Sequence, residues 1–157
     1  MGQVKAINLS KEKGTIKQSV ECGHFIADFG LEGDAHAGKW HRQVSLLGQE
    51  SVDMMKAQGA TGLCAGKFAE NITTEGIILH DLAVGTKLQI GETIQEVTQI
   101  GKECHHGCEI KHQVGSCIMP TQGIFTKVIK GGNVYPGDSV TIMEVECDVQ
   151  GCDYYFK

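Results

Sequence analysis

Three of the seven cysteines and three of the seven histidines in this chain of 157 residues lie within one short segment. They are Cys104, His105, His106, Cys108, His112 and Cys117. Thiolates and imidazoles are ligands for zinc and for softer transition metals, and a thiolate is also a nucleophile. The segment has no sustained period of 2 or 3.6, so we expect a loop. Because functional residues concentrate on loops held by a rigid scaffold, residues 101–132 are predicted to be the active or ligand-binding segment.

Cys104 and Cys108 have the C-x-x-x-C spacing that is typical of one half of a zinc site. His112 or Cys117 would complete a tetrahedral set, so a structural zinc is one interpretation. A second interpretation is that these are ordinary loop residues beside a binding cleft. A third is that Cys104 or Cys108 is a resolving thiol, which attacks a persulfide or sulfenate on Cys117.

The reactive form of Cys117 would be the thiolate, which positive neighbours favour. His112, Arg42 and Lys130 are candidates for that neighbour. The alternative for Cys117 is a buried, inert cysteine at the start of a strand. Arg42 stands at the head of a predicted strand, where it could hold a phosphate in a bidentate manner or form a salt bridge at the end of a barrel.

Four further polar residues are candidates for ligand binding. Asp34 and His36 lie on a glycine-flanked loop and could bind a ligand or position Arg42, although Asp in such a loop also stabilises turns by bonding to the backbone. Glu70 and Asn71 interrupt an apolar strand. Buried polar groups need hydrogen-bond partners, and a polar ligand would supply them.

The composition limits the class of protein. The length fits one domain, and 21 glycines with 2 prolines favour many short strands. A net charge of −5 argues against binding to nucleic acid. No apolar run approaches the roughly 18 residues of a membrane-spanning helix, so we expect no membrane partner. Seven cysteines without a signal for export predict reduced thiols and a cytoplasmic protein.

Periodicity and turn residues predict a mostly β protein, a barrel or sandwich with small helical insertions. One helix is expected over Gln49–Gln58, an irregular glycine-rich loop over residues 21–40 and a turn over Asn133–Asp138. The predicted extended segments are Gly2–Leu9, Thr15–Val20, Arg42–Leu47, Lys67–Thr74, Leu82–Gly91, Thr93–Ile100 (with a bulge), Gly123–Ile129 and Ser139–Val145.

Four segments together resemble the MOSC domain, first described at the C-terminus of molybdenum-cofactor sulfurases. They are Gly30–Gly38 (GLEGDAHAG), Arg42–Leu47 (RQVSLL), Phe68–Ile77 (FAENITTEGI) and Cys117–Phe125 (CIMPTQGIF). The resemblance covers about residues 2–145. It implies a single MOSC domain over 1–157, with residues 146–157 as a C-terminal extension. It also implies a closed β-barrel with a few short helices.

The resemblance further implies a molybdenum-cofactor or sulfur-handling protein that binds a molybdopterin-type cofactor in a barrel cleft. Cys117 matches the family's persulfide carrier or molybdenum ligand, and Asn71 matches an asparagine at the cofactor. Glu70 and Arg42 would complete the cofactor cradle.

Asp34, His36 and Lys130 are further candidates for binding the cofactor. A sulfur transferase or a component of a molybdenum-dependent reductase would fit, with molybdenum-cofactor biosynthesis proteins or molybdoenzymes as partners. No pyridoxal phosphate site is recognisable. The alternative is a non-catalytic module, with or without zinc, that docks a cofactor-biosynthesis partner.

Overall fold

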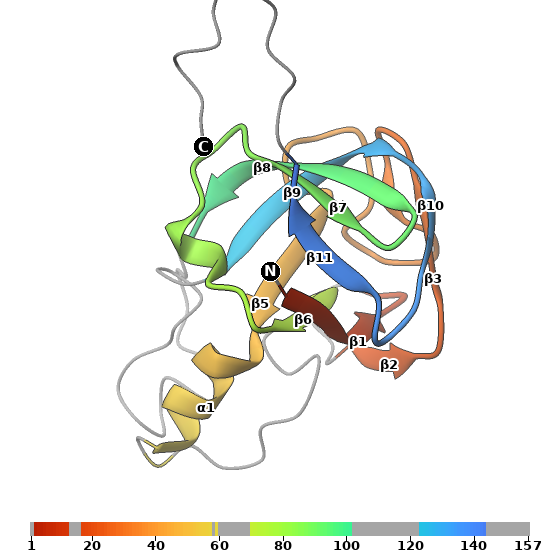
Figure 1. Cartoon of the computed structure of the whole chain (residues 1–157). Helices are drawn as coiled ribbons and strands as arrows, with labels where there is room; N and C mark the ends of the chain where they lie inside the picture. Colours follow the sequence, from red (N-terminus) through yellow and green to blue (C-terminus); the bar gives the residue numbers. More distant parts are fainter. Residues whose placement is uncertain (1, 13–16, 58, 60–69, 102–122, 144–157) are drawn as a thin grey trace, which may run out of the picture.

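The computed structural model describes residues 2–12, 17–57, 59, 70–101 and 123–143. Within these residues the chain forms strands, one α-helix and a single turn of 3-10 helix (Figure 1). In chain order the elements are β1 (Gly2–Leu9), β2 (Gln18–Val20), β3 (Gly23–Ile26), β4 (Gly30–Leu31), β5 (Val44–Gly48), α1 (Gln49–Ala57), β6 (Ile72–Glu75), η1 (Leu79–Asp81), β7 (Lys87–Ile90), β8 (Thr93–Ile100), β9 (Ile124–Lys130), β10 (Gly132–Val134) and β11 (Ser139–Ile142).

Seven of these strands close into a barrel, as the sequence predicts. The order around the ring is β1, β11, β7, β8, β9, β5 and β6, and β6 pairs with β1 to close it. All neighbours are antiparallel except β5 and β6, which are parallel. Parallel strands need a crossover connection, commonly a helix, and α1 lies in the connection between β5 and β6 (Figure 1).

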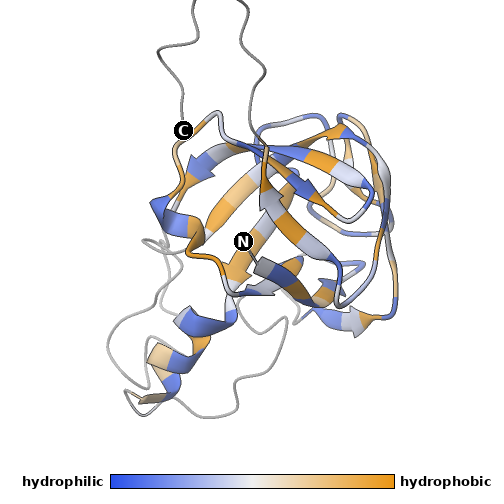
Figure 2. Ribbon diagram, in the orientation of Figure 1, coloured by the Kyte–Doolittle hydropathy of each residue, from blue (hydrophilic) through white to orange (hydrophobic). Residues whose placement is uncertain are grey.

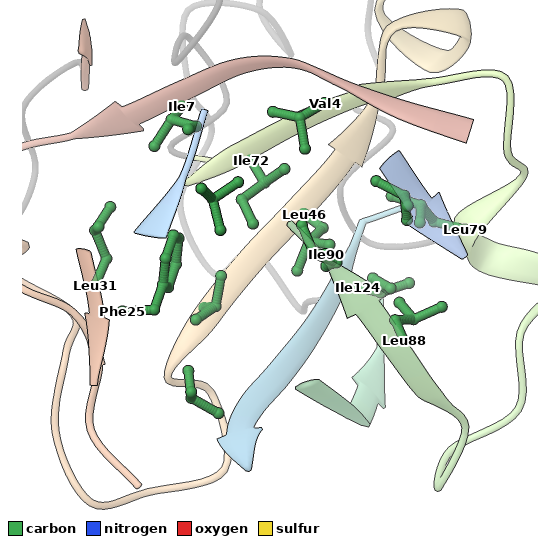
Figure 3. Close-up of a cluster of buried hydrophobic side chains, with 14 of the residues drawn as sticks. Val4, Ile7, Phe25, Leu31, Leu46, Ile72, Leu79, Leu88, Ile90 and Ile124 are labelled. Carbon is green, nitrogen blue, oxygen red and sulfur yellow. The ribbon is translucent and has the colours of Figure 1, made fainter. Parts of the chain in front are cut away.

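The barrel encloses one hydrophobic core. Aliphatic side chains from all seven ring strands meet in it, together with Phe25 of β3 and Leu31 of β4 (Figure 3). Hydrophobic and hydrophilic residues alternate along several strands, and α1 has both kinds (Figure 2). Each fully buried aliphatic or aromatic side chain contributes about 1.5–3 kcal/mol to stability, so this core holds the scaffold. Its buried members include Val4, Ile7, Leu46, Ile72, Leu88, Ile90, Val97, Ile124, Val128 and Val140.

The segment expected to be an irregular loop contains two short strands, which corrects that prediction. β3 pairs with β10 and with β4 in a separate three-stranded sheet. β10 likewise occupies the start of the expected turn at Asn133. These strands are short and rich in glycine, so they show no usable period. Gly30 has φ +123° and a Cβ there would lie 2.8 Å from the Gln43 carbonyl oxygen, so this approach depends on glycine.

The predictions for β1, α1 and β8 agree closely with the structure, whereas three predicted extended segments are longer than the strands found in them. Within Lys67–Thr74 the described strand begins only at Ile72, and within Thr15–Val20 it begins at Gln18. Within Leu82–Gly91 the strand covers only Lys87–Ile90, because residues 84–85 form a turn. β1 has the predicted bounds, α1 begins at the predicted Gln49, and β8 spans the predicted residues. The bulge expected in β8 is present as two register shifts against β9. No helix among the described residues is long and apolar enough to cross a membrane.

Candidate functional site

The strands β8 and β9 meet at the point where the connection between them leaves and re-enters the described residues. Ile100 pairs with Ile124, and the Gly101 N–H donates to the Gly123 carbonyl at 2.6 Å. The predicted residues Cys104, Cys108, His112 and Cys117 belong to the connection 102–122, outside the described residues. Within the described part of the chain, no three His, Cys, Asp or Glu side chains are grouped as a metal site would require. The zinc and thiol predictions therefore stay predictions.

Arg42 is the described site residue whose surroundings are most unusual. Its guanidinium carbon lies 4.8 Å from the centroid of the Trp40 ring and 5.5 Å from that of Phe125. Its Nε atom is buried and has no hydrogen-bond partner among the described residues. Among the described residues Arg42 does not form the salt bridge that was one interpretation of the sequence. The ion pairs found there involve Asp34 with Lys17 and with His36. We refer to Trp40, Arg42 and Phe125 as the arginine stack.

The arginine stack sits beside the ends of the cysteine-rich connection. Phe125 pairs with Gln99 across β8 and β9, one position from the Ile100–Ile124 pair. The Thr98 hydroxyl lies within hydrogen-bond distance of the carbonyls of His41 and Phe125 and shares its one hydrogen between them. The His41 ring lies 2.9 Å from the Gln99 side-chain oxygen. These contacts fasten the segment that carries Arg42 to β8 and β9.

Asp34 and His36 meet around a lysine that the sequence analysis did not select. Lys17 Nζ lies 2.6 Å from Asp34 Oδ1, 3.1 Å from His36 Nδ1 and 3.4 Å from the Ser10 hydroxyl. The side chains of Lys17 and Asp34 are completely buried, whereas the His36 side chain is 29% exposed. We call Ser10, Lys17, Asp34 and His36 the lysine cluster.

The Asp34 carboxylate also organises the backbone around it. Its oxygens accept the backbone N–H groups of Ser10 and His36, each at 3.1 Å. Burial opposes ionisation, but the hydrogen bonds that the carboxylate accepts from the Lys17 ammonium and from the backbone N–H groups of His36 and Ser10 outweigh it. They hold the pKa of Asp34 well below its usual range. Asp34 is thus a buried anion with a full set of donors. The turn-stabilising interpretation is confirmed for it, since it bonds the backbone two residues on.

The lysine cluster and the arginine stack are joined through the backbone. The Trp40 indole N–H donates to the His36 carbonyl at 2.9 Å. The side chain of His36 therefore belongs to the lysine cluster, and the backbone carbonyl of His36 holds Trp40 of the arginine stack. One interpretation of the sequence is that Asp34 and His36 position Arg42, and this chain of contacts is consistent with that interpretation.

Glu70 and Asn71 lie on the opposite flank of β5, in a polar network inside the protein. Both are buried, and the Glu70 carboxylate accepts the Thr73 hydroxyl at 2.9 Å. The Asn71 side-chain oxygen accepts the Ser45 N–H at 3.0 Å, and its amide nitrogen donates to the Asn8 carbonyl at 3.1 Å. These bonds link β1 and β5 to the start of β6. The role of both residues towards a cofactor stays a prediction.

Lys130 is not brought together with these groups. It is exposed at the end of β9, where it pairs with Ile94. It lies five positions from Phe125 along β9, about 16 Å along an extended chain.

Lys17, Trp40 and Phe125 are not among the site residues predicted from the sequence. No local pattern marks Lys17, because its partners are up to nineteen positions away. The spacing Trp40-x-Arg42 was a usable signal, since alternate residues of an extended segment share a side.

The fold and the site define a small closed β-barrel in which charged and aromatic side chains gather around the segment leading into one strand. A family model described as "MOSC domain" matches residues 33–141, and the chain therefore belongs to the MOSC domain family. That family is associated with the molybdenum cofactor. The match covers the lysine cluster from Asp34 onward, the arginine stack and the cysteine-rich connection.

Solved structures with the same fold include YuaD from Bacillus subtilis, at 17% identity and a TM-score of 0.70, with 88% of this chain and 93% of that chain covered. YiiM from Geobacillus stearothermophilus follows at 19% identity and a TM-score of 0.69, over 92% of this chain and 76% of that one. YiiM from Escherichia coli has 19% identity and a TM-score of 0.64, over 95% and 73%. A comparison with curated protein sequences finds no match.

Proposed function

We propose that this protein binds a molybdopterin-type cofactor beside the arginine stack and that Cys117 acts there as persulfide carrier or molybdenum ligand. It would work in the cytoplasm, where thiols stay reduced, and hand cofactor or sulfur to molybdenum-cofactor biosynthesis proteins or molybdoenzymes. Membership of the MOSC domain family supports the class of ligand.

The observation that carries the proposal is the guanidinium of Arg42, whose buried Nε atom is unpaired within the described part of the chain. Arg42 has no carboxylate partner among the residues that the structure describes and is oriented by two aromatic rings. Such an arginine is suited to hold an anion, because the planar fork matches phosphate oxygens. The buried Nε atom has no partner among the described residues. An unpaired buried donor costs about 1–3 kcal/mol, and an anionic ligand would remove that cost. The terminal phosphate of a molybdopterin is such an anion.

The remaining candidates differ in what they offer a cofactor. His36 is partly exposed and lies next to Trp40 through its carbonyl, so it can reach the same ligand. Asp34 acts through the segment that it holds. Asn71 and Glu70 already bond within the protein, so we assign them the task of fixing β1, β5 and β6 around the site. Bound molybdenum would supply the redox centre and accept soft thiolate ligands.

Cofactor retention tests this proposal. The purified protein is incubated without oxygen with molybdenum cofactor released from a donor molybdoenzyme and is then desalted. Pterin is measured by the fluorescence of its oxidised derivative, and molybdenum by mass spectrometry. We expect the wild type to retain pterin and Arg42→Met to lose it. Lys87→Met, which removes an exposed cation of β7, is the matched control and should bind like the wild type.

Two results would count against the proposal. The first is that the wild type retains no pterin under these conditions. The second is that Arg42→Met and Lys87→Met retain the same amount as the wild type.

A further inference from the structure

The lysine cluster contains a buried cation whose hydrogen atoms are fully used. An ammonium group has three N–H donors and no acceptor. Lys17 Nζ has three acceptors in reach, Asp34 Oδ1 at 2.6 Å, His36 Nδ1 at 3.1 Å and the Ser10 hydroxyl at 3.4 Å. The side chain has no exposed surface. Lys17 is therefore a fixed donor and not a free surface charge.

This arrangement determines which nitrogen of His36 carries the hydrogen. Because Lys17 can only donate, the contact at 3.1 Å requires Nδ1 of His36 to be an acceptor. The competing possibility is an Nδ1–H that donates to Asp34 Oδ2. That distance is 3.8 Å, too long for a hydrogen bond, and the hydrogen would also face the Lys17 ammonium. The geometry therefore assigns the hydrogen of the neutral ring to Nε2.

The Nε2–H group of His36 is left without a protein acceptor among the described residues, and the side chain is 29% exposed. The other two described histidines with ring contacts, His24 and His41, bond to amide oxygens of Asn133 and Gln99. His36 differs from both because the buried Lys17 ammonium contacts its Nδ1 atom, while its Nε2 atom has no acceptor among the described residues.

We propose that Lys17 is a positioning residue that fixes His36 as an Nε2–H donor for an oxygen of a phosphate-bearing ligand. Together with Arg42, to which it is linked through Trp40, His36 would then contact the anionic group of that ligand. The identity of the ligand rests on the proposed function, whereas the assignment of Lys17 and of the ring hydrogen does not. Binding of the anionic group is therefore tested with inorganic phosphate. The assignment of Lys17 and of the ring hydrogen is tested without any ligand.

The ligand-free test is nuclear magnetic resonance of protein carrying nitrogen-15 histidine, which distinguishes protonated from unprotonated ring nitrogens. In the wild type we expect His36 to have Nε2 protonated and Nδ1 unprotonated, with one set of signals. Lys17→Met should give a mixture of the two forms, and Lys17→Arg should restore the single form. His24 and His41 are internal references that none of these variants should change.

Two ligand-free results would overturn the assignment. One is a wild-type His36 with the hydrogen on Nδ1. The other is a Lys17→Met protein whose His36 signals equal those of the wild type. If Lys17→Met does not fold, the wild-type spectrum and Lys17→Arg still decide the question.

The ligand half is tested by titrating inorganic phosphate into the wild type, His36→Gln and His36→Asn. The glutamine amide can donate from near the Nε2 position, and the asparagine amide only from near Nδ1. We expect phosphate to shift the His36 Nε2 signal of the wild type. The phosphate affinity of His36→Gln should be within about twofold of wild type, and that of His36→Asn about tenfold lower, as loss of one charged hydrogen bond predicts.

Equal phosphate binding by both variants, or a His36 signal that does not move at saturating phosphate, would contradict the inference. If phosphate shifts the His36 signal but the protein retains no pterin, the inference about Lys17 and His36 stands. In that case the proposed molybdopterin ligand is wrong.

Discussion

Lys17 Nζ lies 2.6 Å from Asp34 Oδ1, and neither side chain has any exposed surface. The pair joins the residue just before β2 to the turn that follows β4. A buried ion pair is worth little relative to an apolar replacement of both partners, but breaking it by removing one partner leaves a buried charge alone. The pair therefore specifies how the segment leading to Arg42 is attached to the barrel.

We expect Asp34→Asn to reduce the free energy of unfolding by about 3–5 kcal/mol, because it leaves the Lys17 ammonium buried without its anion. Urea unfolding followed by circular dichroism measures the change. Asp53→Asn, on the exposed side of α1, is the matched control and should change stability by less than about 0.5 kcal/mol. Equal stability of both variants would mean that the pair is not buried as described.

The same pair predicts a pH dependence. The pKa of folded Asp34 lies well below its usual range, so the unfolded chain takes up a proton first as the pH falls. The contribution of Asp34 to stability is then present at pH values above the pKa of Asp34 in the unfolded chain, which is near 4. It is lost progressively as the pH falls below that pKa. The stability gap between wild type and Asp34→Asn should shrink between about pH 5 and pH 3. A gap that stays constant over this range would contradict the shifted pKa.

Asn71→Ala should destabilise the protein even without any cofactor. The side chain bonds the Ser45 N–H and the Asn8 carbonyl, and leaving such buried groups unpaired costs about 1–3 kcal/mol. Chemical unfolding of the cofactor-free protein provides the measurement. If Asn71→Ala also loses more cofactor affinity than its loss of stability explains, the residue has the additional ligand-binding role that the family resemblance implies. An unchanged stability would refute the bracing role that the structure indicates.

Trp40 is the single tryptophan of the chain, and Arg42 stacks on it at 4.8 Å. Intrinsic fluorescence is therefore a direct reporter of the arginine stack. We expect phosphate or cofactor to change the emission in the wild type and to do so more weakly in Arg42→Lys, which keeps the charge but not the planar fork. An identical titration curve for the two proteins would show that the guanidinium does not hold the anion.

Removal of metal by EDTA tests the interpretations of Cys104 and Cys108. A structural zinc would make the wild type lose thermal stability with EDTA, and Cys104→Ser and Cys108→Ser would lack that response, because metal binding energy is folding energy. Resolving thiols would leave stability nearly unchanged, with more over-oxidised Cys117 in both variants. We expect the second outcome, because Gly107 and the polar residues Glu103 and Glu109 favour a solvated segment.

Local patterns were sufficient for the longest barrel strands and for the helix, and insufficient for the contacts between distant segments. β1, β8 and α1 could be predicted because each alternates or repeats apolar residues over enough positions. The strands β3, β4 and β10 could not, since they are two to four residues long. In addition, β3 and β10 pair with each other across more than a hundred positions.

The same division applies to the site. Arg42, Asp34 and His36 were found from residue type and from the family motif. Lys17 was not, because a lysine side chain is normally exposed, and only the fold reveals that it is buried against Asp34. The aromatic rings that orient Arg42 come from two segments about 85 positions apart, Trp40 and Phe125.

The most direct test of the account is the comparison of wild type with Cys117→Ser after loading with molybdenum cofactor. Serine keeps the size of the side chain but is a poor soft ligand and cannot carry a persulfide. We predict that Cys117→Ser has the wild-type melting temperature, binds phosphate as the wild type does, and loses bound molybdenum or transferable sulfur. Full molybdenum occupancy and full sulfur transfer by the purified serine variant would contradict the central claim.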